Sequence, residues 1–240
     1  MKYVVLAALA LAACSGGGDG NVQSAAPVAA VAAPAGANWT ETVSKTAEGG
    51  YVMGNPAAAI KLVEYGSRTC PTCGAFAREG MEPLGRYVAT GKVSFEFRDY
   101  LVHGAPDLAA ALLGQCGGTG PFFPILDQMY QNQSAYLDRL QQMSPAMQTQ
   151  LQGMPPAQAI AALGEQMALI EFVKQRGVPE AKARACLADS AQIDTLTKHT
   201  QDATASGIVT GTPTFLLNGK KLENTVTWGQ VEQALKAAGA

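Results

Sequence analysis

The sequence predicts an α/β domain that is interrupted by a block of helices, and three observations support this. The apolar run 60–65 has the length of a buried strand, and apolar residues then recur every three or four positions through 77–88, as in a helix. Further strand-like segments follow at 93–97 and 214–217. Between them, 105–190 carries helical patterns that are interrupted by prolines.

The N-terminus reads as an export signal. Lys2 and the apolar run after it predict a signal peptide over 1–13, too short to span a bilayer as a mature helix. The sequence Leu-Ala-Ala-Cys that ends at Cys14 resembles a bacterial lipobox, which implies cleavage before Cys14 and its lipidation. An ordinary secretory signal with a chance cysteine is the alternative. Ser15 permits outer-membrane placement by the usual sorting pattern, and 14–37 predicts a lipidated, disordered tether.

The first part of the domain is predicted over 38–104. A strand within 39–53 ends at the turn signal Gly-Asn-Pro, and 60–65 is the next strand. Pro83 predicts a kink in the helix that follows. In 93–98 apolar and polar residues alternate, which indicates a strand with one less buried face.

The helical insertion is predicted over 105–190. Its clearest helix carries apolar residues on one face from Ile160 to Val173, before Gly177 and Pro179 stop it. The Gln-, Met- and Pro-rich stretch 141–158 predicts an exposed loop or a short extra helix.

The second part of the domain is predicted over 191–240. A long helix occupies 189–206, and Asn218-Gly219 predicts a tight hairpin between two short strands. Thr227 and Gln230 have capping-box spacing and start a last amphipathic helix.

We expect the reactive residues in the segment Cys70-Pro71-Thr72-Cys73, where a predicted strand ends and a predicted helix begins. Cys70 falls at the helix start, where unpaired N–H groups and the helix dipole lower a thiol pKa and favour the nucleophilic thiolate. Pro71 is tolerated there because its missing N–H is not needed in the first turn. Cys73 lies on the same helix face and can close a short disulfide with Cys70.

A metal site is the alternative from another functional class. Two cysteines at this spacing can be half of a zinc site, but the sequence has no second pair of this kind and only two histidines, His103 and His199. Three methionines could suggest copper(I) binding, although methionines fill packing gaps far more often: Met143, Met147 and Met154. A module that only docks one partner is a third interpretation. We expect neither a metal nor an organic cofactor. His103 is expected to be a loop histidine without a role.

Three motifs in order, 61–65, the Cys70–Cys73 pair and Thr212-Pro213, resemble the DsbA family of thioredoxin-fold oxidoreductases from about residue 49 onward. The resemblance implies a thioredoxin fold with an inserted helical domain. It implies that Pro213 is cis and faces the cysteines, and that the backbone of Thr212 pairs with substrate polypeptide.

The resemblance also assigns further roles. Glu64 matches an acid kept beneath the active site, and a buried carboxyl there could relay a proton to or from Cys73. The alternative is a strand-edge glutamate in solvent. We expect Pro71 and Thr72, between the two cysteines, to contact substrate.

Cys116 and Cys186 remain, both in the helical insertion. We expect a structural disulfide between them for three reasons. They are the two cysteines that remain after the other three are assigned, the expected compartment is oxidising, and some relatives have a similar second pair. Two buried free thiols are the alternative.

Together these features predict an envelope thiol–disulfide oxidoreductase, a periplasm-facing lipoprotein that introduces disulfides into secreted proteins. Its expected partners are reduced or unfolded envelope proteins and a membrane redox partner that resets the Cys70–Cys73 disulfide. A formal net charge of −2 without a basic patch argues against nucleic acid. Isomerases of this superfamily are typically dimers held by an N-terminal domain. Because 15–37 contains no heptads, we expect a monomeric oxidase rather than an isomerase or reductase.

Overall fold

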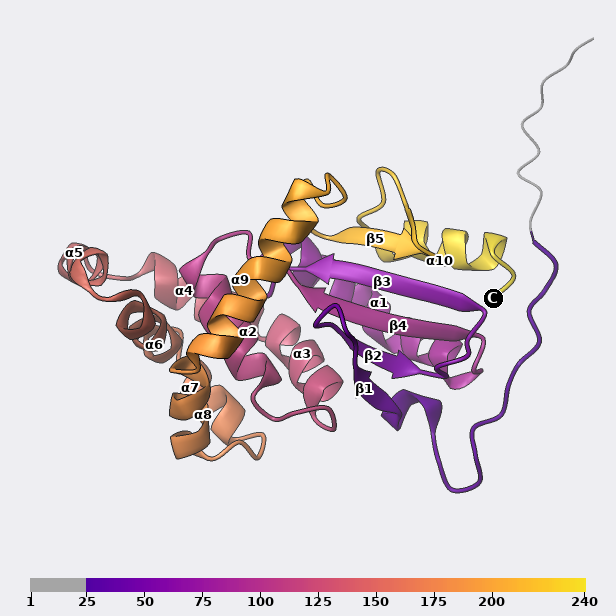
Figure 1. Cartoon of the computed structure of the whole chain (residues 1–240), viewed down its shortest axis with the longest axis horizontal. Coiled ribbons are helices and arrows are strands. Elements are labelled where there is room, and N and C mark those ends of the chain that lie inside the picture. The colour runs from indigo at the N-terminus through magenta and orange to yellow at the C-terminus, as the bar shows by residue number, and fades with distance from the viewer. Residues whose placement is uncertain (1–24) are drawn as a thin grey trace, which may run out of the picture.

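The computed structural model describes residues 25–240, so the predicted signal peptide and Cys14 lie outside the described residues. Its centre is a six-stranded sheet in the order β1-β2-β4-β3-β5-β6 (Figure 1). The neighbours β3 and β4 run parallel, and all other neighbouring strands are antiparallel. The strands are β1 (Val43–Lys45), β2 (Tyr51–Gly54), β3 (Ile60–Gly66), β4 (Val93–Asp99), β5 (Thr214–Leu217) and β6 (Lys220–Lys221). The short 3₁₀-helix η1 (Trp39–Glu41) precedes β1.

One face of the sheet is covered by two helices. The helices α1 (Pro71–Ala89) and α10 (Trp228–Ala237) lie behind the strands in Figure 1. Phe95 and Phe97 of β4 are fully buried in one core with Leu84 and Val88 of α1. The other face is crossed at one end by α9 (Ser190–Ala205). This arrangement is the α/β fold that the sequence predicted.

The alternation in β4 separates the two faces, but the polar face is less open than predicted. Ser94 and Glu96 are only 5 % and 9 % exposed. Glu96 pairs with Arg98 at 2.7 Å and accepts the hydroxyl hydrogen of Thr46 at 2.7 Å. These contacts account for the burial of the Glu96 side chain on the polar side of the strand.

The helical insertion between β4 and β5 forms a second core. Its central helix is α2 (Ala105–Gln115), which packs against α3, α6, α7, α8 and α9. The other helices of the insertion are α3 (Phe122–Gln131), α4 (Gln133–Gln141), α5 (Pro145–Gly153), α6 (Pro156–Gln166), α7 (Leu169–Lys174) and α8 (Glu180–Leu187). The stretch left open as a loop or a short helix therefore contains a short helix, α5.

The single helix predicted from Ile160 to Val173 is wrong. Ala168 has φ 56°, a left-handed conformation, and it divides the segment into α6 and α7. No glycine or proline marks this break. The change of direction lets Leu169, Ile170 and Val173 join the same core as Ile160 of α6, so tertiary packing overrides the local helical pattern.

The predicted disordered tether is also wrong over 25–37. Ala25 and Val28 donate backbone hydrogen bonds to the carbonyls of Ala237 and Gly239 at the end of α10, both at 2.8 Å. Val31 donates to the carbonyl of Thr90, after α1, at 2.9 Å. The last carbonyls of a helix lack partners within the helix, and Ala25 supplies one to Ala237, the last residue of α10.

The C-terminal elements confirm the local predictions. Asn218 and Gly219 have φ of 49° and 79°, as a tight hairpin turn requires, and Thr227 with Gln230 forms a capping box on α10.

Cys116 and Cys186 are joined in a disulfide, with Cα atoms 6.0 Å apart. Within 25–240, no helix has the length and apolar character to cross a membrane.

Candidate active site

The two motif cysteines lie at the junction of β3 and α1. Cys70 is the N-cap residue of α1, and Cys73 lies in its first turn. Cys70 is 8 % exposed and Cys73 is closed to solvent, and both are thiols in this structure. Pro71 and Thr72 are exposed between them. Cys70 is therefore the more accessible of the two thiols.

The hydrogen bonds around the pair separate the two thiols. The pKa of Cys70 is lowered to about 5, and the largest cause is the hydrogen bond that the Cys73 thiol donates to it, while burial acts in the opposite direction. Thr212 and the backbone N–H groups of Cys73 and Thr72 also contribute to the lowering. Burial, followed by the hydrogen bond to Cys70 and the charge of Glu64, raises the pKa of Cys73 well above its usual value. The site thus holds an outer thiolate and an inner thiol.

Glu64 lies in β3 beneath these cysteines and is 1 % exposed, so the alternative of a strand-edge glutamate in solvent is wrong. Burial raises the pKa of Glu64 well above its usual value, and the charges of Cys70 and Asp99 raise it further. Its Oε1 atom has no hydrogen-bond partner in the described part of the chain. A buried carboxyl with a raised pKa that interacts electrostatically with Cys73 can exchange a proton with it.

The cysteines face a second segment that is distant in the sequence. The Cys70 thiol lies 3.4 Å from the carbonyl oxygen of Thr212, and the Thr212–Pro213 peptide bond is cis. A cavity of about 260 Å³ lies beside them, lined by 210–214 and 221–226. The residues expected to bind substrate from both motifs are therefore brought to one place.

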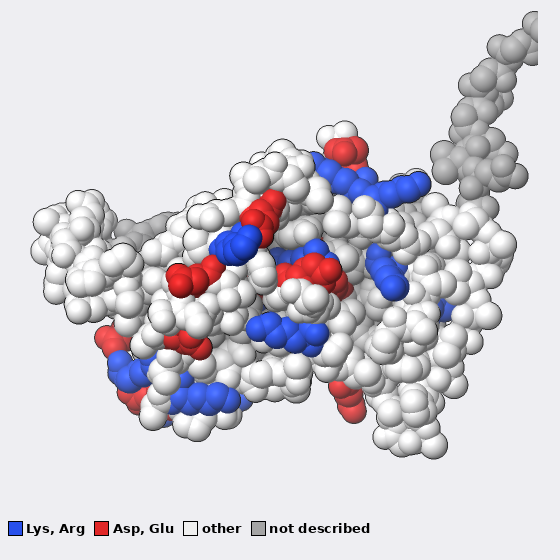
Figure 2. Space-filling view, viewed as in Figure 1, with Lys and Arg blue, Asp and Glu red and all other residues white. Residues whose placement is uncertain are grey.

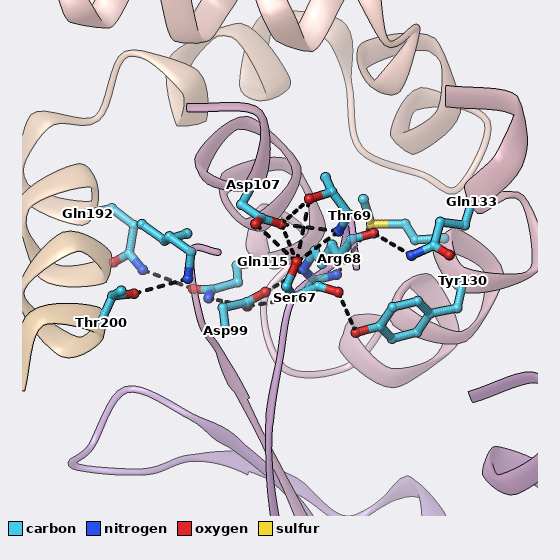
Figure 3. A network of polar contacts seen from close by, with 12 residues as sticks. Ser67, Arg68, Thr69, Asp99, Asp107, Gln115, Tyr130, Gln133, Gln192 and Thr200 are labelled. Atoms are coloured by element: carbon cyan, nitrogen blue, oxygen red, sulfur yellow. Dashed lines mark hydrogen bonds and ion pairs between the residues drawn. The ribbon is translucent and has the colours of Figure 1, made fainter. Parts of the chain in front are cut away.

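The loop before Cys70 is anchored by a buried ion pair (Figure 3). Arg68 is fully buried and donates two hydrogen bonds to the Asp99 carboxylate, at 2.7 and 3.1 Å. Gln115 of α2 donates to the same carboxylate at 2.8 Å. The guanidinium also lies 5.6 and 5.3 Å from the ring centres of Phe97 and Phe122, so both its charge and its planar face have partners.

A second carboxylate, Asp107 in the first turn of α2, binds the same loop. It accepts hydrogen bonds from the hydroxyls of Ser67 and Thr69, both at 2.8 Å, and from the backbone N–H groups of Thr69 and His103. The ring of His103 contacts the Thr69 hydroxyl at 2.7 Å. His103, which was expected to have no role, thus contacts the residue that precedes Cys70.

Side chains of α3 and α4 complete the support for this loop. Tyr130 donates to the carbonyl of Ser67 at 3.2 Å, and Gln133 donates to the carbonyls of Arg68 and Cys70 at 3.1 and 2.9 Å. Tyr136 donates to the carbonyl of Arg68 as well. Sequence reasoning missed these residues. One sequence pattern could have indicated these residues: polar groups occur at three-residue intervals, at 130, 133 and 136, beside the apolar positions of α3 and α4.

A metal centre receives no support from side chains in the described region. Within 25–240, no three His, Cys, Asp or Glu side chains are grouped so that they could hold a metal ion. His199 lines a separate cavity with Arg98 and Glu48, on the α9 side of the sheet.

Three features together define a thioredoxin-fold protein: the parallel β3–β4 pair, the C-x-x-C motif at a helix start and the opposing cis-proline. In this chain the fold also carries an inserted helical region. The chain belongs to the thioredoxin family whose model, Thioredoxin_4, matches residues 46–237. It is similar to a putative protein-disulfide oxidoreductase of Rickettsia bellii, with 28% identity over 182 residues, 75% of this chain and 61% of that protein. A Rickettsia prowazekii protein of the same description is 24% identical over 189 residues, 77% of this chain and 60% of that one. The chain thus spans about 60% of the length of these relatives.

Solved structures confirm the fold. A protein-disulfide isomerase from Novosphingobium aromaticivorans superposes with a TM-score of 0.75 at 28% identity, covering 80% of this chain and 98% of that one. The alpha-DsbA1 protein of Wolbachia pipientis superposes with a TM-score of 0.62 at 18% identity, covering 78% and 89%. The helical insertion of a DsbA-like thioredoxin fold is therefore present in this chain.

Proposed function

We propose that this protein is a dithiol oxidase that transfers its Cys70–Cys73 disulfide to cysteines of other proteins. The observation that carries the proposal is the pairing of a Cys70 thiol with a pKa of about 5 and a buried Cys73 thiol. A stabilised Cys70 thiolate favours the reduced pair, and this makes the corresponding disulfide an oxidant.

The proposed reaction begins with the oxidised pair. A client thiolate attacks Sγ of Cys70, the Cys70–Cys73 bond breaks, and a mixed disulfide forms. Cys73 leaves as a thiolate, and the buried carboxyl of Glu64 can supply its proton. A second client thiolate then attacks the client sulfur of the mixed disulfide and releases Cys70 as a thiolate. Two client thiols become one disulfide, and the Cys70–Cys73 pair becomes a dithiol.

The same proposal includes the cellular setting. Cys14 would carry the lipid anchor, and the catalytic domain would face the periplasm from a membrane of the bacterial envelope. Ser15 is compatible with the outer membrane. The partners would be reduced or unfolded envelope proteins and a membrane redox partner that reoxidises Cys70 and Cys73. The proposed form is a monomer.

Disulfide isomerisation is the second candidate, because the similar Novosphingobium aromaticivorans protein is described as a protein-disulfide isomerase. An isomerase starts from its dithiol form and rearranges existing disulfides, whereas an oxidase is consumed by reduced clients. Reduction of client disulfides uses the same dithiol form. The two candidates therefore differ in the redox state of Cys70 and Cys73 that acts on the client.

The test compares two substrates. The oxidised protein is mixed with a reduced, unfolded model protein, and the dithiol form with the same model protein carrying scrambled disulfides. We expect fast oxidation in the first reaction and little activity in the second. With the scrambled model protein, the Cys70 thiolate of Cys73→Ala should attack a client disulfide and accumulate as a mixed disulfide, and Cys70→Ala should form none. Efficient repair of scrambled disulfides without oxidation of thiols would replace the oxidase by an isomerase.

A further inference from the structure

An apolar groove lies on the insertion side of the active site. It has a volume of about 410 Å³ and runs between α2, α6 and α9. Its walls include Leu101, Ala105, Leu108, Ala159, Ile160 and Ile193. None of the side chains that line it is charged. We call it the insertion groove.

The absence of charge from this part of the surface extends beyond the groove. The chain from 140 to 164, which contains α5 and most of α6, has no Lys, Arg, Asp or Glu. Figure 2 shows the corresponding lobe without coloured residues, while charged side chains gather over the sheet and α9. A charged ligand would lose hydration in this groove without gaining a partner. An apolar group is the ligand chemistry that fits.

One edge of the groove lies near the loop that precedes Cys70. Gly104 and Ala105, which line it, directly follow His103, whose ring contacts Thr69 at 2.7 Å. Thr69 precedes Cys70, so the path through these residues from the Cα atom of Cys70 to that of Gly104 is about 16 Å long. An extended polypeptide advances roughly 3.3 to 3.6 Å per residue, and four or five residues cover this path. Val102, at the same rim, is 43 % exposed.

We propose that the insertion groove receives an apolar side chain of the client polypeptide, four or five residues from the cysteine that bonds to Cys70. The inference rests on the proposed function, because only a client held at Cys70 fixes this distance. It assigns to the helical insertion a role in choosing clients, besides its support of the active-site loop. Unfolded proteins expose apolar side chains, whereas folded proteins bury most of them, so the groove would favour unfolded clients.

The preference can be measured with short cysteine peptides. The peptides carry one Phe at the fourth or fifth position from the cysteine, on the N-terminal or the C-terminal side, in a Ser/Gly background. A reference peptide has no Phe. The readout is the rate constant for mixed-disulfide formation with the oxidised protein. Burial of a Phe side chain should make at least one Phe peptide react about tenfold or more faster than the reference.

Substitutions that place a larger side chain of the protein itself in the groove test the same inference. Ala159→Phe places a ring in the groove, and Ala157→Phe places the same ring on an exposed position of the same helix, α6. Ala159→Phe should lose most of the preference for the Phe peptide, and Ala157→Phe should keep it. Thr197→Phe fills the groove from α9 and should act like Ala159→Phe. Far-ultraviolet circular dichroism and the reaction with glutathione show that each variant is folded and active.

The outcomes separate two failures. If wild type reacts with glutathione but treats all peptides alike, or if Ala159→Phe and Thr197→Phe keep the preference shown by Ala157→Phe, the groove inference is wrong while the proposed function stands. If the Cys70–Cys73 disulfide does not react with glutathione, the proposed function is wrong and the inference falls with it.

Discussion

The sulfur of Cys70 lies 3.4 Å from the carbonyl oxygen of Thr212, although 142 positions separate the two residues in the chain. The sheet creates this contact, because β3, which leads to Cys70, pairs with β5, which begins just after Thr212. The reactive sulfur and a peptide edge are therefore presented together. Under the proposed function, a client cysteine that reaches Cys70 would also bring its backbone beside Thr212.

Cys70 should be the reactive thiol of the reduced protein. Because its pKa is lowered to about 5, the rate of alkylation by iodoacetamide should rise to half its maximum near pH 5 and stay level above about pH 7. Cys73 should remain unlabelled over this range, since its pKa is raised. Mass spectrometry of the alkylated protein identifies the labelled thiol. A half-maximal rate above pH 8, or faster labelling of Cys73, would contradict this account.

The same measurement on a variant tests the cause of the lowered pKa. Cys73→Ala removes the thiol that donates to Cys70, which is the largest cause of the low pKa. The half-maximal alkylation rate should therefore shift to higher pH. An unchanged profile would assign the effect to the backbone N–H groups and the helix start instead.

Glu64→Gln should stabilise the protein at neutral pH. The pKa of Glu64 is raised in the folded state, so its carboxyl binds a proton more tightly folded than unfolded. Its cost to stability is absent below about pH 4 and grows as the pH rises through the unfolded pKa toward the folded pKa. The advantage of Glu64→Gln in urea unfolding should therefore be present at pH 7 and vanish near pH 4. A destabilised variant at pH 7 would contradict it.

Glu64→Gln should also slow catalysis, because glutamine cannot exchange a proton with Cys73. We expect the step that opens or closes the Cys70–Cys73 disulfide to slow by about tenfold or more. Stopped-flow fluorescence with a reduced client follows this step. Alkylation of Cys70 is the control and should remain fast. An unchanged rate would remove Glu64 from the mechanism.

Arg68→Met should destabilise the protein strongly. It leaves the buried carboxylate of Asp99 without its ion-pair partner, a change that costs about 3 to 5 kcal/mol in comparable sites. Arg86→Met breaks an exposed ion pair with Glu82 and should change the free energy of unfolding by less than about 1 kcal/mol. Urea unfolding compares the two variants. Equal effects would mean that the Arg68 pair contributes no more than a surface contact.

Replacing both Cys116 and Cys186 by alanine should lower stability without removing the Cys70 reaction. The bridge joins residues 70 positions apart, for which the chain-entropy model gives a stabilisation of about 4 to 5 kcal/mol at most. Thiol counting on the unfolded, unreduced protein and urea unfolding of the variant test the bridge and its contribution. Two additional free thiols in the wild type would show that the pair is not bonded.

The sequence predicted those parts of the protein that depend on neighbouring residues. The strand before Cys70, the helix after it, the Asn218-Gly219 turn and the capping box at Thr227 follow from local patterns. The break at Ala168 could not be predicted, because packing in the second core imposes it without a glycine or proline.

The partners of the residues that support the active-site loop could not be predicted from the sequence either. Asp107, Tyr130 and Gln133 lie 38 to 65 positions from the residues they hold, and no local pattern gives such partners. No local pattern indicates the partner of Val28 either, whose backbone N–H donates to the carbonyl of Gly239 just after α10. Sequence patterns located the chemistry, and tertiary contacts determined how it is held.

The equilibrium of the Cys70–Cys73 pair with glutathione tests the central claim most directly. The reduced fraction is measured across a series of glutathione ratios by trapping free thiols with a mass tag. Thr72 offers no cation to the Cys70 thiolate, so we predict a reduction potential above that of thioredoxin, about −270 mV, and below that of DsbA, about −120 mV. A potential at or below that of thioredoxin would contradict the proposal that this protein oxidises its clients.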